Sequence, residues 1–512
     1  MAWRGRVVRD RYVDSIRLMA IAAQLREGDG IKDAKVGIGT PANRELLAQL
    51  GLALDARPAD VMLAVDGSDE ETAAAALQRG EQALTAADEG SADDAQAAAV
   101  APRTSAAARA ATGDVANVAI VSVPGQYAAL EAHRALTEEM HVFLFSDHVT
   151  VSDEVELKRR GRDAGLLVMG PGCGTAMLGG VGLGFCNVVP PGPVGIVAAA
   201  GTGAQEAAVL LAAAGVGTSQ IIGVGGRDLH DDVGAIMFRQ GMELLACDEQ
   251  TETLLLVSKP PDREAVRALA DVDVNGKRVV AAFVGWRSDG DDPFEIHNTV
   301  QGGALAAAGA PAPDLLSLER SIQSRVEARA KGSGGGDGGC LLGLFSGGSL
   351  AYEAVTLLEP VLGPLDGNAG GASDDALDSR PPTPHHQIFD LGEEEYTQGV
   401  PHPMVDLETR IGFLRQQAAD PGVGCVLLDV VLGYGSHPDP AGGLAPALTE
   451  LTESGTIVIA HVCGTTLDPQ DSESQERTLR EAGAIVAPTN AAAARLAALA
   501  VAGARVAEGA SA

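Results

Sequence analysis

The sequence predicts an α/β protein built from several doubly wound domains. Near-continuous apolar runs at 118–123, 142–145 and 166–169 alternate with helical stretches. Fully apolar strands separated by helices are typical of parallel sheets that are buried on both faces. Glycine accounts for 64 of the 512 residues and aromatic residues for only 3%. This composition suits glycine turns between strands and helices better than an aromatic-rich all-β fold.

Composition shifts and glycine-rich stretches divide the chain into segments. Residues 88–114 and 331–339 lack a hydrophobic period, so we predict a flexible linker and a hinge there. A polar insert at 366–384 interrupts the last block. The expected domains are a small α/β domain at 1–87, a Rossmann-like domain at 115–190, an α/β domain at 191–330 and another at 340–500.

Within the first two domains the pattern is regular enough to place elements. We predict βαβ-type alternation in the first domain and a helix capped by Ser152 or Asp153 in the second. The expected helices lie at 14–25, 41–50, 69–86 and 128–137, and the expected early strands at 34–38 and 61–65.

Charge and cysteine usage narrow the function. Lys plus Arg number 37 and Asp plus Glu number 69, so the formal net charge is −32. This balance argues against nucleic-acid and membrane partners, which need clustered basic residues. No uninterrupted apolar run is long enough for a transmembrane helix, and no signal-peptide core is found, so we expect a cytoplasmic protein. The six cysteines form no CxxC pair, and no metal site is predicted.

A strand, a glycine turn and a helix start occur twice. Residues 194–207 and 341–354 share the pattern of a strand followed by G-[S/T]-x-x-x-E-A, and later elements of the two blocks also correspond. The equivalent residues are Gly201 and Gly348, Thr202 and Ser349, and Glu206 and Glu353. The duplication predicts two similar domains in a pseudo-twofold relation.

Each repeated turn carries the chemistry of an anion site. A helix N-terminus offers unpaired N–H groups and a positive dipole end, and glycine lets an anion approach the backbone. The alternative is a tight strand-to-helix turn with nothing bound. The predicted phosphate- or substrate-binding residues are Gly201, Thr202, Gly203, Gly348 and Ser349, with Gly225 and Gly226 from a second glycine turn.

Four residues at strand ends or in rigid loops are the catalytic candidates. The guanidinium group of an arginine fits a carboxylate or phosphate, and a lysine can hold an anion. Structural ion pairs and packing are the alternatives. The four candidates are Arg227, Asp228, Lys259 and His402. Asp429, at the end of a buried strand, could bind a ligand or fix a loop, and His461 with Cys463 could form a nucleophilic pair.

These motifs resemble a known family. The segments 194–207 and 223–228 resemble the ligase domain of succinyl-CoA synthetase α chains, and 340–465 resembles the corresponding β-chain domain. Over nearly its whole length the chain is similar to the FdrA family of acyl-CoA-synthetase-like proteins. The motifs that carry this likeness are GTPAN at 39–43, LVMGPxCGT at 167–175, IGVGGRDL at 222–229, VSKPP at 257–261, PHPMVD at 401–406 and LLDVVLG at 427–433.

The resemblance implies a CoA-binding-type Rossmann domain followed by two flavodoxin-like ligase domains. The residues in its coenzyme A position are Pro124, Gly125, Gln126 and Tyr127. It also implies a carbamoyltransferase that acts with companion subunits of one pathway in an oligomer, in purine-ureide (allantoin) breakdown. The reaction would convert oxalurate and phosphate to oxamate and carbamoyl phosphate. Phosphate is then a substrate, coenzyme A is left open as a ligand, and no other cofactor is predicted.

The sequence also departs from the ligases. No histidine stands in register with their phosphohistidine near 301–305, although His297 lies close by. Lys259 stands where the ligases carry the supporting glutamate, Ala200 and Ala204 replace two hydroxyl residues, and no ATP-grasp domain is found. We therefore expect transfer between phosphate and an acyl or carbamoyl group. The alternatives are an ADP-forming acyl-CoA ligase with a displaced phosphohistidine and a non-catalytic ligand-binding homologue.

Overall fold

The computed structural model describes residues 3–9, 11, 13, 15–26, 28–57, 60–89, 102, 104–113, 115–332, 339–369, 385–397, 401–418 and 422–503. Two compact units are present, Met1–Ala101 with Thr397–Pro401, and Pro102–Tyr396 with His402–Ala512. Most of the predicted hinge and polar insert lie outside the described residues. In the described part of the chain, no helix is long and apolar enough to cross a bilayer.

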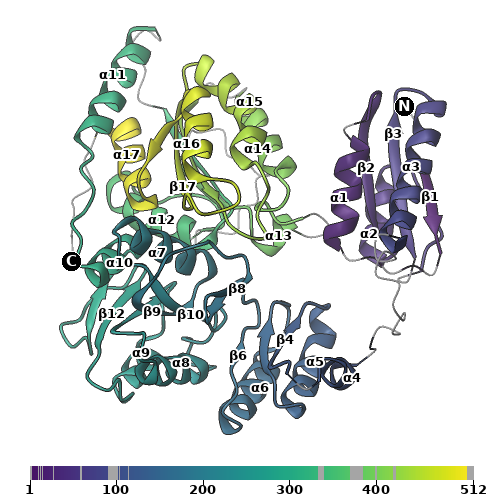
Figure 1. Cartoon of the computed structure of the whole chain (residues 1–512). Coiled ribbons are helices and arrows are strands. Elements are labelled where there is room, and N and C mark those ends of the chain that lie inside the picture. Colours follow the sequence, from purple (N-terminus) through teal and green to yellow (C-terminus); the bar gives the residue numbers. More distant parts are fainter. Residues whose placement is uncertain are drawn as a thin grey trace. The chain divides into compact units, whose positions relative to one another are not determined.

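The first unit is a three-stranded sheet covered by helices (Figure 1). Val61, Leu63 and Val65 of the central strand pack against α1 and α3, whereas Met62 and Ala64 belong to the core on the α2 face. This alternation is what a strand buried on both faces requires. The elements are β1 (Arg4–Val8), α1 (Ser15–Arg26), β2 (Ile31–Ile38), α2 (Pro41–Gln49), β3 (Val61–Gly67) and α3 (Glu70–Glu89).

The second unit begins with a small parallel sheet in the order β4-β5-β6. The strands are short because each ends at a turn that starts a helix or a loop, as in Rossmann-like domains. The elements are α4 (Ser105–Ala111), β4 (Val118–Val121), α5 (Gly125–Thr137), β5 (His141–Leu144), α6 (Val151–Asp163) and β6 (Val168–Met169).

A seven-stranded sheet follows, in the order β13-β12-β11-β9-β10-β7-β8. Strands β9 to β13 run parallel, whereas β7 and β8 form an antiparallel edge. The strands are β7 (Thr175–Leu178), β8 (Val181–Gly184), β9 (Pro191–Ala199), β10 (Thr218–Gly223), β11 (Thr253–Ser258), β12 (Arg278–Phe283) and β13 (Glu295–His297). The helices are α7 (Gly201–Ala213), α8 (Ile236–Cys247), α9 (Arg263–Leu269), α10 (Val300–Ala308) and α11 (Leu316–Gly332).

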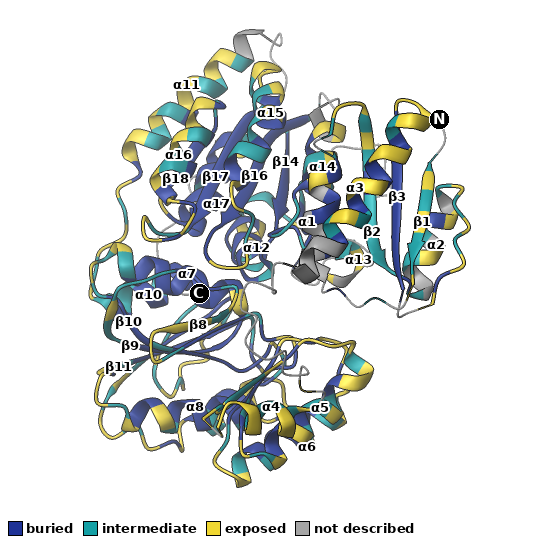
Figure 2. Cartoon of the chain, turned by 45° about the vertical axis from the view of Figure 1, so that its right-hand side comes forward, coloured by how far each residue is buried: buried dark blue, intermediate teal, exposed yellow. Residues whose placement is uncertain are grey.

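The last sheet has five parallel strands in the order β15-β14-β16-β17-β18, and its central strands are buried along their length (Figure 2). The strands are β14 (Cys340–Phe345), β15 (Gln387–Asp390), β16 (Val423–Val431), β17 (Ile457–Cys463) and β18 (Ile485–Ala487). The helices are α12 (Gly348–Leu362), α13 (Glu394–Thr397), α14 (Glu408–Ala418), α15 (Pro440–Glu453), α16 (Ser472–Glu481) and α17 (Asn490–Ala502).

Two sheets of the second unit share one topology. Numbered from β9, the strands β10-β9-β11-β12-β13 have the order 2-1-3-4-5, and numbered from β14 the last sheet has the same order. This is the flavodoxin-like arrangement. The predicted fold class is therefore confirmed, with a Rossmann-like domain followed by two similar doubly wound domains.

Some sequence-based expectations were wrong in detail. The first sheet is entirely antiparallel, because β1 and β2 both run opposite to β3, whereas βαβ alternation suggests parallel strands. Thr150, rather than Ser152 or Asp153, caps α6, and its side chain accepts a hydrogen bond from the N–H of Asp153. The helix α4 occupies part of the predicted linker. Alternating apolar residues identify the elements, but strand direction and cap geometry depend on the chain path.

Candidate functional site

The two repeated turns lie against one another. α7 begins at Gly201 and α12 at Gly348, and the N–H of Ser349 donates to Oγ1 of Thr202 over 3.3 Å. The caps of these helices, Ala200 and Gly347, provide no side-chain cap bond. Within the described residues, the N–H groups of Gly201, Thr202, Gly203 and Gly348 have no hydrogen-bond partner. Two positive dipole ends with free donors therefore meet at one place.

The topology explains why the turns meet a ligand-binding edge. In an open α/β sheet, ligands bind beyond the carboxyl ends of the strands where the strand order reverses. In the two sheets this point lies between β9 and β11 and between β14 and β16. Lys259 follows β11 directly, and Asp429 lies near the end of β16. Lys259 and Asp429 therefore stand at the edge where α7 and α12 begin.

Lys259 and Asp390 flank the start of α12. A Cβ added at Gly348 would overlap Oδ2 of Asp390 and would lie 2.9 Å from Nζ of Lys259. Lys259 also forms an ion pair with Glu393, with 3.6 Å between Nζ and Oε1. The start of α12 therefore has one cation and one buried carboxyl group beside its free N–H groups. We call Gly201–Gly203, Lys259, Gly348, Ser349 and Asp390 the anion site.

Asp429 shapes the turn that precedes α12. Its side chain is fully buried, Oδ1 accepts from the N–H of Ser346 over 2.9 Å, and Oδ2 accepts from the N–H of Gly347 over 2.9 Å. Arg410, also buried, holds the same carboxylate at 2.7 Å. Of the two roles considered for Asp429, the contacts match that of fixing the loop.

His402 lies beside the anion site. A Cβ placed on Gly392 would lie 2.8 Å from Nε2 of His402 and 3.1 Å from Oδ1 of Asp390. The two side chains are therefore neighbours. Nδ1 of His402 accepts from the N–H of Met404, so the proton is placed on Nε2, and its ring stacks near Phe185. Burial lowers the pKa of His402 to about 4, opposed by Asp429 and Glu393. Near neutral pH this histidine is uncharged and can donate one hydrogen bond.

Arg227 and Asp228 lie in a buried ion-pair network instead. Asp228 is fully buried, accepts from the N–H of Phe238 over 2.7 Å and pairs with the fully buried Lys158 at 2.7 Å. Arg227 pairs with Glu154 at 2.8 Å, and Lys158 also binds Glu154. The network joins α6 to the loop after β10. Asp228 is enclosed and has no path to a substrate, and Arg227 is held by Glu154, so the two residues belong to this network and not to the anion site.

The second glycine turn is also structural at one position. Gly225 has φ +85°, and a Cβ there would collide with backbone atoms of Gly170 and Pro171. A Cβ on Gly226 would touch nothing closer than the carbonyl oxygen of Ala199 at 3.9 Å. Close packing between two backbone segments thus explains why a glycine is needed at position 225. Among the described residues, no contact joins Gly226 to the anion site.

The residues in the coenzyme A position form the β4–α5 turn. Pro124 caps α5 without a side-chain bond, so the first N–H groups of this helix are available to an anion. Gly125 packs against the backbone oxygens of Asp147 and His148, where a side chain would not fit. Tyr127 is 55% exposed. Gln126, in the first turn of α5, lies beside them.

The repeated glutamates connect the two flavodoxin-like domains by hydrogen bonds, a role that the sequence did not reveal. Oε1 of Glu206 on α7 accepts from the N–H of Asn490 at the start of α17, over 3.2 Å. In the opposite direction, Oε1 of Glu353 on α12 accepts from the N–H of Gln301 at the start of α10, over 3.3 Å. Each glutamate thus caps the helix that follows the fifth strand of the other domain, and both are fully buried.

A buried histidine also takes part in this contact between the domains. Nε2 of His461 lies 2.7 Å from Oε2 of Glu206. Burial opposes ionisation of both groups, but their mutual attraction outweighs it, so the pKa of Glu206 is lowered and that of His461 is raised. Burial and then Glu206 raise the pKa of Glu353. Burial and Glu206 also raise the pKa of Cys463 well above its usual value, and His461 is engaged by Glu206, so both observations argue against a nucleophilic Cys–His pair.

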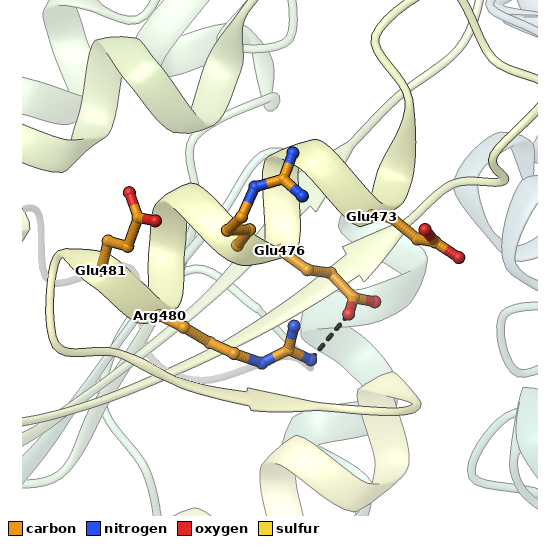
Figure 3. A pocket seen from close by; sticks show the side chains of 5 residues that line it. Glu473, Glu476, Arg480 and Glu481 are labelled. Carbon is orange, nitrogen blue, oxygen red and sulfur yellow. Dashed lines mark hydrogen bonds and ion pairs between the residues drawn. The ribbon is translucent and has the colours of Figure 1, made fainter.

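A surface hollow of about 520 Å³ lies elsewhere (Figure 3). It is lined by Glu473, Glu476, Arg477, Arg480 and Glu481 of α16, and Arg480 pairs with Glu476 at 2.7 Å. Since its lining comes from one helix and includes no residue of the anion site, it has no part in the candidate site.

Comparison with known proteins places the chain in a family. Residues 344–500 match the CoA-ligase family, and residues 1–101 match a family described as AllF, heavy metal-associated domain. The chain is 33% identical over 497 residues to the uncharacterized protein YahF of Escherichia coli, covering 94% of this chain and 95% of YahF. The chain belongs to the CoA-ligase-type family of YahF.

More distant relatives of this YahF-family chain are ligase subunits. It is 28% identical over 181 residues to the α-2 subunit of a mitochondrial succinate–CoA ligase of Trichomonas vaginalis, covering 33% of this chain and 56% of that subunit. It thus spans little more than half of that relative. The structure of PH0766 from Pyrococcus horikoshii matches with a TM-score of 0.27 and 16% identity, over 75% of this chain and 83% of that one.

The heavy-metal description does not fit the residues of the first unit. The first histidine of the chain is His133 and the first cysteine is Cys173, so residues 1–101 contain neither. Soft metal ions select thiolate and imidazole ligands. Across the described residues, no cluster of three His, Cys, Asp or Glu side chains could hold a metal ion. We therefore assign no metal chemistry to this unit.

Proposed function

We propose that this CoA-ligase-type protein catalyses phosphate-dependent acyl transfer at the anion site. An oxygen of phosphate attacks the carbonyl carbon of an acyl donor, the bond to the leaving group breaks, and an acyl phosphate forms. The meeting of the two uncapped helix starts beside Lys259 carries this proposal. Their free N–H groups and the ammonium group would hold the phosphate and stabilise the charge that develops on the oxyanion.

The first candidate donor is a thioester of coenzyme A, which gives acyl phosphate and free coenzyme A. The family and the names of the ligase relatives support it. The open first turn of α5, with Gly125, Gln126 and Tyr127, would hold the phosphates of coenzyme A.

The second candidate donor is an N-carbamoyl compound such as oxalurate, which gives oxamate and carbamoyl phosphate. Lys259 suits this donor as well as the first, because a cation there would hold phosphate itself where the ligases support a phosphohistidine with a glutamate. The resemblance of the motifs to the FdrA family supports the N-carbamoyl donor.

Purified protein incubated with phosphate and either succinyl-CoA or oxalurate tests the function. We expect phosphate-dependent release of thiol from the first donor or of carbamoyl phosphate from the second. Reactions without phosphate are the control. If neither donor gives a phosphate-dependent product, with or without the proteins encoded by neighbouring genes, the proposal is wrong.

We propose further that companion subunits complete the enzyme and that the assembly is oligomeric. The limited coverage of the ligase α subunits supports this, since part of their length has no counterpart in the chain. Addition of the neighbouring gene products is therefore expected to raise turnover by orders of magnitude. A typical enzyme rate of about 1–10³ s⁻¹ from the purified chain would contradict this.

His297 is expected to remain unphosphorylated after incubation with ATP or an acyl phosphate. It ends β13, the edge strand of its sheet, and the strands β12 and β11 lie between it and β9, after which α7 begins. Its Nε2 is engaged by Glu295 at 3.0 Å. Intact-mass and peptide mass spectrometry under alkaline conditions provide the measurement. Stoichiometric phosphohistidine at His297 would instead favour an ADP-forming acyl-CoA ligase.

A further inference from the structure

Asp390 is a buried carboxyl group with one unused oxygen. It is the last residue of β15 and is 4% exposed. Its Oδ1 accepts from the N–H of Gly392 over 2.9 Å. Its Oδ2 has no hydrogen-bond partner within the described part of the chain. This oxygen faces Gly348, because a Cβ there would overlap it. Because the side chain is otherwise buried, a ligand or a proton at the start of α12 is what can satisfy this oxygen.

The groups around Asp390 come from several elements. Lys259, after β11, and Glu393, after β15, form an ion pair beside it, and Asp429 of β16 and His402 also lie close to it. Burial raises the pKa of Asp390 to about 7, Lys259 opposes this, and Glu393 and Asp429 reinforce it. The pKa of His402 lies near 4, so this histidine does not change charge around neutral pH.

An ionised carboxylate at this position would repel the anion that the helix starts and Lys259 attract. A protonated carboxyl group would instead donate a hydrogen bond to it. If phosphate is held at the start of α12, the acyl donor that it attacks must lie there too, within reach of Asp390. A group at this place can therefore both bind phosphate and move a proton.

We propose that Asp390 is the proton-transfer residue of the acyl-transfer reaction, an inference that rests on the proposed function. As the bond from phosphate oxygen to the carbonyl carbon forms and the bond to the leaving atom breaks, the Asp390 carboxyl group gives its proton to the leaving atom. The carboxylate then takes the proton that monohydrogen phosphate loses on becoming the acyl phosphate. The products are the acyl phosphate and the protonated leaving group, and the Asp390 carboxyl group is restored.

The proposal predicts different effects of an Asp390 substitution on the two candidate donors. A thiolate leaves readily without a proton because thiols ionise near pH 8.5, whereas the nitrogen of an amide donor must be protonated as it leaves. Asp390→Asn keeps the size of the side chain and removes its acidity. We expect kcat to fall about 10²- to 10⁴-fold with an amide donor and less than about tenfold with a thioester.

Sulfate binding tests the role of Asp390 without turnover, because sulfate does not titrate near neutral pH. For the wild type, the sulfate dissociation constant is expected to rise about tenfold between pH 6 and pH 8, as Asp390 ionises. In Asp390→Asn it is expected to change less than about twofold. Asp289→Asn is the matched control, since this exposed aspartate pairs with Arg263 on the surface and should leave the wild-type pH dependence unchanged.

The outcomes distinguish this inference from the proposed function. A flat pH dependence in the wild type, or an unchanged tenfold rise in Asp390→Asn, overturns the role of Asp390 while phosphate-dependent turnover can persist. Full activity of Asp390→Asn with an amide donor overturns it as well. If neither sulfate nor phosphate binds the wild-type protein, both the proposed function and the inference fail.

Discussion

Gly348→Ala is expected to weaken anion binding strongly. The added Cβ would overlap Oδ2 of Asp390 and lie 2.9 Å from Nζ of Lys259, so it would displace the two side chains that flank the start of α12. Overpacking of this kind costs about 1–3 kcal/mol, and where the bound state bears this cost the affinity falls by about 5- to 150-fold. Calorimetric titration with sulfate or phosphate gives the affinity, and thermal unfolding shows whether the fold persists.

Gly201→Ala provides the matched comparison. A Cβ at this position meets only Oγ1 of Thr175, at 3.7 Å, within 4 Å. We therefore expect Gly201→Ala to bind the anion more tightly than Gly348→Ala does, even though the two glycines are equivalent in the repeat. Equal and unimpaired binding by both variants would show that the anion does not lie at the start of α12.

The repeated strand–turn–helix motif was the part of the candidate site that the sequence predicted best. A glycine and a hydroxyl residue at matching places after two strands were enough to predict that Gly201 and Gly348 are equivalent. This is possible because the residues next to a strand-to-helix turn determine its geometry. That Thr202 contacts the backbone of Ser349 follows only from how the two domains pack.

The residues that sequence reasoning missed act through tertiary contacts. Asp390 ends a short strand and looks like many other aspartates, and only the fold brings it to Gly348 and Lys259. Asp228 follows two glycines, as a ligand-binding residue would, yet its partner Lys158 lies on a helix of the preceding domain. Loop position is a good guide to binding residues, but burial by distant segments decides which of them reach a ligand.

The glutamate of each repeat has a role that neither motif shows by itself. Glu206 and Glu353 each reach into the opposite domain and accept from the first turn of a helix there. Since both helix starts are buried, their N–H groups need these acceptors. The duplication thus places a glutamate at the interface and a glycine at the proposed anion site, about one helical turn apart on α7 and on α12.

Removal of Glu206 is expected to cause a large loss of stability in the ligase-like domains. Glu206→Ala leaves the buried His461 without its partner at 2.7 Å and the N–H of Asn490 without an acceptor. Breaking a buried ion pair by removing one partner costs about 3–5 kcal/mol. Hydrogen–deuterium exchange of peptides that cover α17 and β17 measures the loss locally. Glu264→Ala, an exposed helix position paired with Arg267, is the control and should leave this exchange unchanged.

The stabilising effect of the pair depends on pH in a defined direction. The pKa of Glu206 is lowered from 4.5, so its contribution is present above that value and is lost as the pH falls through the folded-state pKa. The pKa of His461 is raised from 6.5, so its contribution is complete below that value and is lost as the pH rises through the folded-state pKa. The difference in exchange protection between the wild type and Glu206→Gln should therefore be largest between about pH 4.5 and 6.5 and shrink on either side. A difference that is independent of pH would mean that Glu206 holds the domains together through its hydrogen bond to Asn490, without charge on His461.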